Sequence, residues 1–237
     1  MNNARARNCD VVASLLSRDE RLVLLTPGEN DALSPYQITR DKVMTTEEIQ
    51  RLMGLCEKKA RADLVNGRKI WVVRHMLVHL AWASGLRAGE LSALRIEHLN
   101  LAGEHPSLLV LHPDGDFREV FIGLGLAAHI RDFMHTRRTA WQEPIGPGSP
   151  LLPGRGGKPY TVPALCFSFR RAIEAARLPR RHSLRHARHS YSAFLLASTG
   201  NLRFVQRQMG HSSQSMTALY QDVAPEINAA MAGLLIS

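Results

Sequence analysis

Apolar residues recur at helical spacing through most of the chain. Thr45, followed by Glu47 and Glu48, is typical of a helix start, and Ile49, Leu52 and Cys56 then repeat on one face. The pattern predicts that this first helix gives way to a charged loop over 58–69. Further helices are expected over 70–84, from about Arg87, and over 123–138, 161–178, 183–198, 201–209, from 215, and 224–235.

Two short segments near the middle of the chain break the helical pattern. Residues 107–111 and 117–122 are predicted strands, and the turn residues 113–116 between them favour a β-hairpin. Residues 143–159 are rich in Pro and Gly and are expected to be irregular. The fold class is therefore mainly α with a small antiparallel β-sheet.

The chain is expected to have two parts. Residues 1–43 carry turn signals and only one apolar patch, so they are interpreted as a partly ordered N-terminal arm. Residues 44–237 are expected to form one domain that closes with a C-terminal helix. Met1 to Asp10 is polar and predicts no signal peptide.

Charge narrows the choice of partner. The formal net charge is +9, and the arm contributes none of it because its six basic residues balance six acidic ones. Such an excess favours a polyanion as partner. Three widely spaced cysteines favour reduced thiols, and hence a cytoplasmic protein over one with a disulfide framework.

The excess charge is concentrated late in the chain. No carboxylate lies between Glu174 and Asp222, and this interval contains four histidines, ends near Tyr220, and includes the arginines Arg177, Arg180, Arg181, Arg185, Arg188, Arg203 and Arg207. Cations, imidazoles and a phenol are the groups that covalent attack on a phosphodiester requires. If that polyanion is DNA, the DNA-binding residues that contact its sugar–phosphate backbone would be Arg180, Arg181, Arg188, Arg203 and Arg207, with simple solvation as the alternative for Arg180 and Arg181.

Four ordered motifs resemble those of the tyrosine recombinases, the family of phage integrases and Xer-type resolvases. Residues 84–91, SGLRAGEL, look like the first box, with Arg87 on its arginine. Residues 182–186, HSLRH, look like the second, with His182 and Arg185 on its histidine and arginine. Residues 209–213, MGHSS, place His211, and Tyr220 follows at the family's spacing. The resemblance extends from about Met44 to Ile227.

The resemblance implies a fold, an activity and a set of roles. The family's catalytic domain is mainly helical with a small sheet, and it acts on double-stranded DNA without a cofactor or metal. Arg87 and Arg185 would bracket the scissile phosphate, His211 would donate a hydrogen bond, and His182 would accept or relay the proton of Tyr220. Tyr220 would attack phosphorus to give a 3′-phosphotyrosine, so that strands are cut and rejoined during integration, excision or inversion.

The chain departs from the family pattern in three places. The family usually has a lysine at the hairpin tip, whereas no lysine occurs here between Lys69 and Lys158; Arg118, or less readily His112, is the substitute in reach. The segment after Arg185 is about three residues longer than usual, around 188–190. Only 43 residues precede the motif-bearing part, so the resemblance is to short forms without the N-terminal DNA-clamping domain, with helper proteins as one alternative.

Other functions stay open at this point. The missing lysine favours a catalytically weak DNA-binding accessory or regulatory protein of a mobile element with the same fold. A relaxing enzyme similar to type IB topoisomerases is a further alternative. His182, His186 and His189 share helical spacing that could hold a metal, but no carboxylate or cysteine lies near them in sequence. The apolar stripe over 224–237 predicts self-association on DNA through the C-terminal helix.

Overall fold

The computed structural model describes residues 38–111, 115, 117–221 and 223. The predicted arm up to residue 37, most of the hairpin turn and the predicted helix over 224–235 lie outside these residues. The described part begins with buried Ile38 and a 3₁₀ turn, η1 (Arg40–Lys42), which contacts α8 (Leu184–Thr199). A boundary of the arm at residue 43 stays a prediction.

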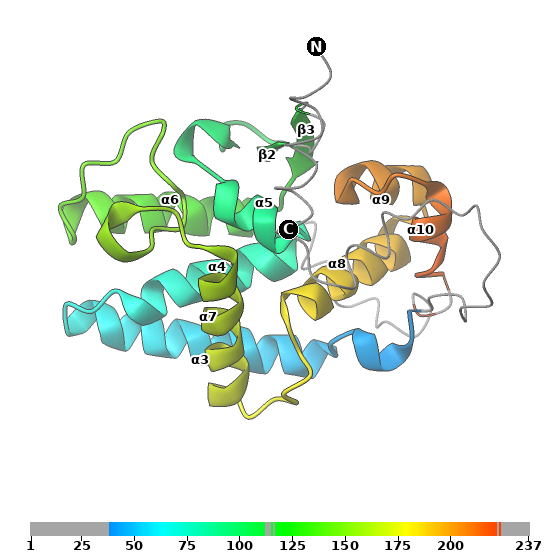
Figure 1. Ribbon diagram of the computed structural model, residues 1–237, viewed down its shortest axis with the longest axis horizontal. Helices are drawn as coiled ribbons and strands as arrows, with labels where there is room; N and C mark the ends of the chain where they lie inside the picture. Colours follow the sequence, from blue (N-terminus) through cyan, green and yellow to red (C-terminus); the bar gives the residue numbers. More distant parts are fainter. Residues whose placement is uncertain (1–37, 112–114, 116, 222, 224–237) are drawn as a thin grey trace, which may run out of the picture. The chain divides into compact units, whose positions relative to one another are not determined.

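Helices and one small sheet make up this part of the chain (Figure 1). The remaining elements, in chain order, are α3 (Thr46–Val65), α4 (Ile70–Ser84), α5 (Ala88–Ala93), η2 (Ile96–His98), β1 (Leu99–Asn100), β2 (Ser107–Leu111), β3 (Phe117–Phe121), α6 (Leu124–Thr139), η3 (Arg155–Gly157), α7 (Val162–Ala175), α9 (Leu202–Met209) and α10 (Gln214–Ala218). The predicted class, mainly α with a small antiparallel sheet, is confirmed. No helix in the described ranges has the length and apolarity needed to cross a membrane.

A pair of reciprocal hydrogen bonds fixes the start of α3. Thr45 accepts a hydrogen bond from the backbone N–H of Glu48, and the Glu48 carboxylate accepts one from the N–H of Thr45, which completes a capping box. The predicted loop over 58–69 is wrong in its first half, because α3 continues to Val65. Its charged residues are straight-chain helix formers on the solvent side, while Ala60 and Asp63 continue the buried face. The helix stops only at Asn66-Gly67, where Gly67 adopts a left-handed conformation.

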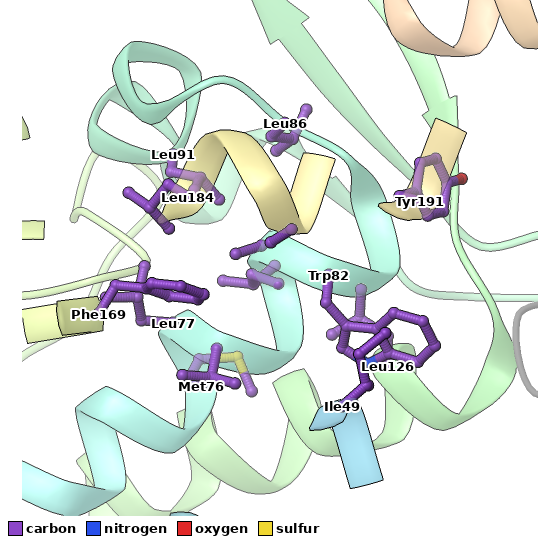
Figure 2. Packing of buried hydrophobic residues seen from close by; sticks show 14 of the residues in the cluster. Ile49, Met76, Leu77, Trp82, Leu86, Leu91, Leu126, Phe169, Leu184 and Tyr191 are labelled. Atoms are coloured by element: carbon purple, nitrogen blue, oxygen red, sulfur yellow. The ribbon is translucent and has the colours of Figure 1, made fainter. Parts of the chain in front are cut away.

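The core forms around α4 and α8. α4 packs against α3, α6, α7 and α8, and Figure 2 shows Met76, Leu77 and Trp82 of α4 among buried residues of the neighbouring elements. Every residue of α8 from Ala187 to Leu196 is buried. A helix that is enclosed on all sides holds its side chains in fixed positions, so polar residues on α8 are placed precisely.

The hairpin places Arg118 on the inward face of the sheet. β2 pairs antiparallel with both β1 and β3, and Val110 lies opposite Arg118. Because side chains alternate across a strand, Arg118 shares the inward face with buried Val120. Gln208 of α9 fixes this strand, since it bonds both the N–H and the carbonyl of Phe121 and donates to the hydroxyl of Tyr191 on α8.

A buried arginine holds the irregular connection over 143–159. Arg137, near the end of α6, donates to the carbonyls of Pro150 and Leu151 and to the carboxylate of Glu143. These bonds satisfy carbonyl groups that no helix or strand would pair. The connection therefore returns to the core at buried Leu151 and Leu152 without regular structure.

Candidate active site

The Glu90 carboxylate, in the first turn of α5, lies close to arginines from three parts of the chain: the start of α5, β3 and α8. α4 ends at Gly85, which is left-handed, and the chain turns so that Arg87 becomes the N-cap of α5. The backbone N–H of Arg87 donates to Glu90 Oε2 at 2.7 Å, and its Nη1 donates to Oε1 at 3.0 Å. Arg87 is thus fixed at a helix start, and its side chain is still 30% exposed.

Arg118 approaches the same carboxylate from β3. Its Nη1 lies 2.6 Å from Glu90 Oε1 and its Nη2 lies 3.1 Å from Oε2, a bidentate pair. Arg118 also lies against Gly210, where a Cβ atom would be only 2.9 Å from its Nε. The hairpin arginine named in the sequence analysis is therefore part of the cluster.

Arg188 of α8 is the third member. Its Nη1 donates to the carbonyl of Gly85 at 2.6 Å, and its Nη2 donates to that of Met209 at 2.7 Å. Nη1 also lies 4.0 Å from Glu90 Oε2. Arg188 therefore joins the end of α4 to the end of α9, in the region of Figure 1 where α5, β3, α8 and α9 converge.

The end of α9 brings in the histidine motif. Gly210 is left-handed and ends the helix, its carbonyl accepts a 2.9 Å hydrogen bond from Arg87, and His211 follows at once. The Nδ1 of His211 lies 2.9 Å from the Thr217 hydroxyl of α10. This bond fixes the ring orientation, and the ring is parallel to that of Tyr220, with centroids 6.1 Å apart.

Tyr220 lies just after α10 and is almost fully buried, with 4% of its surface exposed. Its hydroxyl lies 2.7 Å from Nδ1 of His189, a buried residue of α8. The phenol is therefore held between two imidazoles, one parallel to its ring and one bonded to its oxygen. Arg188 is close enough for the phenol to influence the pKa of its guanidinium.

Burial and mutual charge set the protonation of the site. Burial alone would raise the pKa of Glu90, but the hydrogen bonds from Arg118 and the charges of the three arginines lower it to about 2. Burial, followed by the charge of Arg87, lowers the pKa of Arg188 to about 9. Burial and the nearby arginines lower the pKa of His211 to about 2 and that of His189 to about 3, so both imidazoles are neutral at pH 7.

The structure brings together Arg87, Arg118, His211 and Tyr220 of the predicted site residues, whereas His182 is hydrogen-bonded to Glu48. His182 is buried ahead of α8, and its Nε2 lies 2.9 Å from the Glu48 carboxylate at the start of α3. Its contacts therefore join two helix starts. Arg185 is partly exposed on α8, and its charge lowers the pKa values of His186 and His189.

One of the predicted DNA-binding arginines differs from the others in its surroundings. Arg188 is buried in the cluster and bonded to two backbone carbonyls, because α8 turns its face toward Gly85 and Met209. The remaining residues of the DNA-binding set are exposed: Arg180, Arg181, Arg203 and Arg207.

Sequence reasoning missed Glu90, Arg188 and His189 as members of the site. A signal was present, because the pair Arg185-His186 is repeated three positions later as Arg188-His189. The apparent three-residue excess after Arg185 is the same offset. If the second arginine of the motif is Arg188, that excess disappears.

Comparisons with known proteins agree with this arrangement. The model of the phage integrase family matches residues 42–226. A tyrosine recombinase XerD of Rhizobium meliloti (strain 1021) is 32% identical over an alignment of 197 residues that covers 79% of this chain and 59% of that protein. A tyrosine recombinase XerC of Bradyrhizobium diazoefficiens is 26% identical over 73% of this chain and 54% of its own length. The chain thus spans little more than half the length of these relatives.

Solved structures share the fold. A XerH site-specific recombinase bound to a palindromic difH substrate, in a post-cleavage complex, matches with a TM-score of 0.67 and 19% identity over 83% of this chain and 53% of that one. The Tn1549 transposon integrase in complex with transposon right end DNA matches with a TM-score of 0.61 and 18% identity over 84% and 66%. Because the family model matches residues 42–226, most of the chain, and the arginine–histidine–tyrosine cluster is in place, the chain belongs to the phage integrase family.

Proposed function

We propose that this chain is the catalytic part of a site-specific DNA recombinase that cuts and rejoins DNA through a 3′-phosphotyrosine. The observation that carries the proposal is the convergence of Arg87, Arg188 and His211 around Tyr220, with Arg87 more than a hundred residues before the other three. Membership of the family and the DNA-bound recombinases among the structural neighbours support it.

In this mechanism, the arginines stabilise the charge that develops on phosphorus. Arg87, which is the more exposed, and Arg188, which is held by two carbonyls, bracket the non-bridging oxygens of the scissile phosphate. His211, with Nδ1 against Thr217, presents its other nitrogen as a further hydrogen-bond donor. The second arginine of the mechanism is thus Arg188 and not Arg185.

Tyr220 is the nucleophile. Its oxygen attacks phosphorus, the bond to the 5′-oxygen breaks, and the protein remains joined to the 3′ end. The phosphodiester energy is conserved in the phosphotyrosine, so attack by a 5′-hydroxyl of another strand restores an intact backbone.

Arg118 replaces the hairpin lysine as a source of positive charge near the leaving oxygen. It is bonded to Glu90 at the centre of the cluster and not displayed at the surface. A guanidinium stabilises an oxyanion but gives up a proton poorly, because its ordinary pKa is above about 12. Departure of the 5′-oxygen is therefore the slow step on ordinary DNA.

Double-stranded DNA is the proposed partner. The exposed arginines Arg203 and Arg207 of α9, together with Arg180 and Arg181 ahead of α8, would contact its backbone. Self-association on DNA through the C-terminal helix, with helper proteins as an alternative, extends this proposal to residues outside the described part. We place the protein in the cytoplasm, on nucleoid DNA.

A covalent-trapping selection tests the proposal without knowledge of the target site. Duplexes with randomised sequence and a nick are incubated with the protein, and complexes that survive denaturing detergent are recovered and sequenced. A nick close to the cut lets the short 5′ product diffuse away, so the adduct accumulates. We expect adducts that converge on one sequence, with none from Tyr220→Phe.

The opposite outcome favours the accessory protein. If both the original chain and Tyr220→Phe bind DNA equally but neither forms an adduct, the chain is a DNA-binding regulator with this fold. The absence of the hairpin lysine is the observation that favours this second function.

A further inference from the structure

The proposed cleavage step requires a group that accepts the hydroxyl proton of the nucleophile. Tyr220 must lose its hydroxyl proton as its oxygen bonds to phosphorus. His182, the acceptor expected from the sequence, is engaged with Glu48 ahead of α8. His182 precedes α8, which begins at Leu184, whereas His189 lies within that helix. The structure thus gives the expected acceptor a carboxylate partner and places a different histidine against the phenol.

His189 has the geometry of a proton acceptor. Its Nδ1 lies 2.7 Å from the Tyr220 oxygen, within the distance that a general base requires before chemistry begins. Both residues are buried, at 9% and 4% exposed, so bulk water does not compete freely for the proton. In the neutral tautomer that carries its proton on Nε2, Nδ1 accepts from the phenol.

We propose that His189 is the general base of strand cleavage and the general acid of strand rejoining. This inference rests on the proposed function, with Tyr220 as nucleophile. During cleavage, the bond from Tyr220 Oη to phosphorus forms, the bond to the 5′-oxygen breaks, and the Oη proton moves to His189 Nδ1; the departing 5′-oxygen takes a proton from water. Rejoining reverses each transfer, and His189 returns its proton to the tyrosine.

The surrounding charges make this base dependent on DNA. Burial comes first among the causes that lower the pKa of His189 to about 3, followed by its charged and titratable neighbours on α8 and η1: Arg188, Arg185, His186 and Lys42. A bound phosphate places negative charge beside these cations and raises the proton affinity of the imidazole. His189 therefore becomes an effective base only when the scissile phosphate is in place.

The variant His189→Asn separates proton transfer from positioning. The asparagine Oδ1 occupies the place of Nδ1, so it still accepts the tyrosine hydrogen bond but takes no proton. Single-turnover adduct formation is measured from pH 6 to pH 10 on the selected nicked duplex. We expect a loss of about 10²- to 10⁴-fold at pH 7. The loss should narrow toward pH 10, because hydroxide then takes the tyrosine proton in place of the missing base.

Two results would overturn the assignment. One is a rate for His189→Asn equal to that of the original chain at pH 7; the other is a deficit that stays constant across the pH range, as a structural role would give. His182→Gln is the matched control: it also removes a buried imidazole but keeps a donor toward Glu48, and its deficit should not vary with pH.

The original chain gives an independent measurement if His189→Asn does not fold. Its adduct rate should rise tenfold per pH unit and then level off at the pKa of His189 in the DNA complex. A rate that climbs without levelling to pH 10 would exclude a histidine base. Adducts formed by Tyr220→Phe would instead show that the nucleophile, and so the proposed function, is wrong.

Discussion

At the scale of single residues, Glu90 holds together three guanidinium groups that would otherwise repel one another. It accepts hydrogen bonds from Arg87 and Arg118 and lies 4.0 Å from Arg188. A buried carboxylate with such partners stabilises the fold only while it is ionised. DNA would supply a second anion to the same arginines, so Glu90 keeps the site assembled before DNA binds.

This arrangement predicts how stability depends on pH. The pKa of Glu90 is lowered from 4.5 to about 2 in the folded state, so its contribution is complete above pH 4.5 and is lost as the pH falls toward 2. A shift of that size corresponds to about 3 kcal/mol. The difference in unfolding free energy between the original chain and Glu90→Gln should be constant from pH 5 to 7 and shrink below pH 4.5.

Denaturant unfolding at a series of pH values measures that difference. Glu57→Gln is the control, because Glu57 pairs with Arg61 on the exposed surface of α3 and should change stability by less than about 1 kcal/mol at any pH. A gap for Glu90→Gln that does not close in acid would mean that its carboxylate is not the group responsible.

A second prediction distinguishes the two candidate arginines. Arg188→Lys keeps a charge but loses the fork that binds the carbonyls of Gly85 and Met209. We expect it to lower the adduct rate by about 10²-fold or more, the loss found for one transition-state donor. Arg185→Lys should reduce the rate by less than about tenfold. The reverse order in single-turnover assays would restore Arg185 as the second catalytic arginine.

At the scale of elements, the end of α9 determines where the hairpin arginine lies. Gly210 is left-handed, and an added Cβ would come within 2.9 Å of Arg118. Gln208, two residues earlier, bonds the backbone of Phe121 on β3. The helix end and the strand are thus positioned together, and Arg118 enters the cluster because both are in place.

Two glycines in the same conformation give a matched test. Gly200 ends α8 with φ 61° and Gly210 ends α9 with φ 64°, but only Gly210 faces another residue closely. Each Gly→Ala change should cost about 1 kcal/mol or more for the left-handed backbone. Only Gly210→Ala should also displace Arg118 and slow adduct formation. Equal effects of both variants on rate would mean that Arg118 does not depend on this contact.

At the scale of the whole molecule, we expect net charge to affect DNA binding more than any single residue does. The chain carries a formal charge of +9. Exposed arginines of the DNA-binding set lie on either side of α8 in sequence: Arg180 and Arg181 before it, and Arg203 and Arg207 after it. Affinity for duplex DNA should therefore fall steeply with salt, because each neutralised phosphate releases counterions. Arg203→Ala with Arg207→Ala should flatten the log–log slope by about two and leave the single-turnover rate at saturation unchanged. An unchanged slope would mean that α9 does not contact the DNA backbone.

Assembly is a separate prediction at this scale. Deleting residues 226–237 should preserve the fold and binding to one site but remove larger complexes on DNA, because the apolar stripe there is predicted to dock on a neighbouring subunit. Sedimentation with and without DNA measures this. Unfolding of the truncated monomer would show instead that the segment packs within its own chain.

Local signals in the sequence determined most of the element boundaries. α4, α9 and both long strands lie where periodicity and turn residues predicted them, because caps, glycine stops and strand alternation act over a few neighbouring residues. The order of motifs also indicated the family, which the comparison over residues 42–226 confirmed. The exception was α3, whose charged second half was mistaken for a loop although charged straight-chain residues favour a helix.

Tertiary structure decided which of several similar residues form the site. Arg185-His186 and Arg188-His189 lie three positions apart on α8, so both pairs fall near one helix face and periodicity does not separate them. Only the packing of α8 against Gly85, Met209 and Tyr220 places Arg188 and His189 in the cluster. The sequence by itself determined which reactive side chains are available, whereas long-range contacts decided which of them form the site. The physical reason is that a helix fixes the spacing of its residues but not the partner that each of its faces contacts.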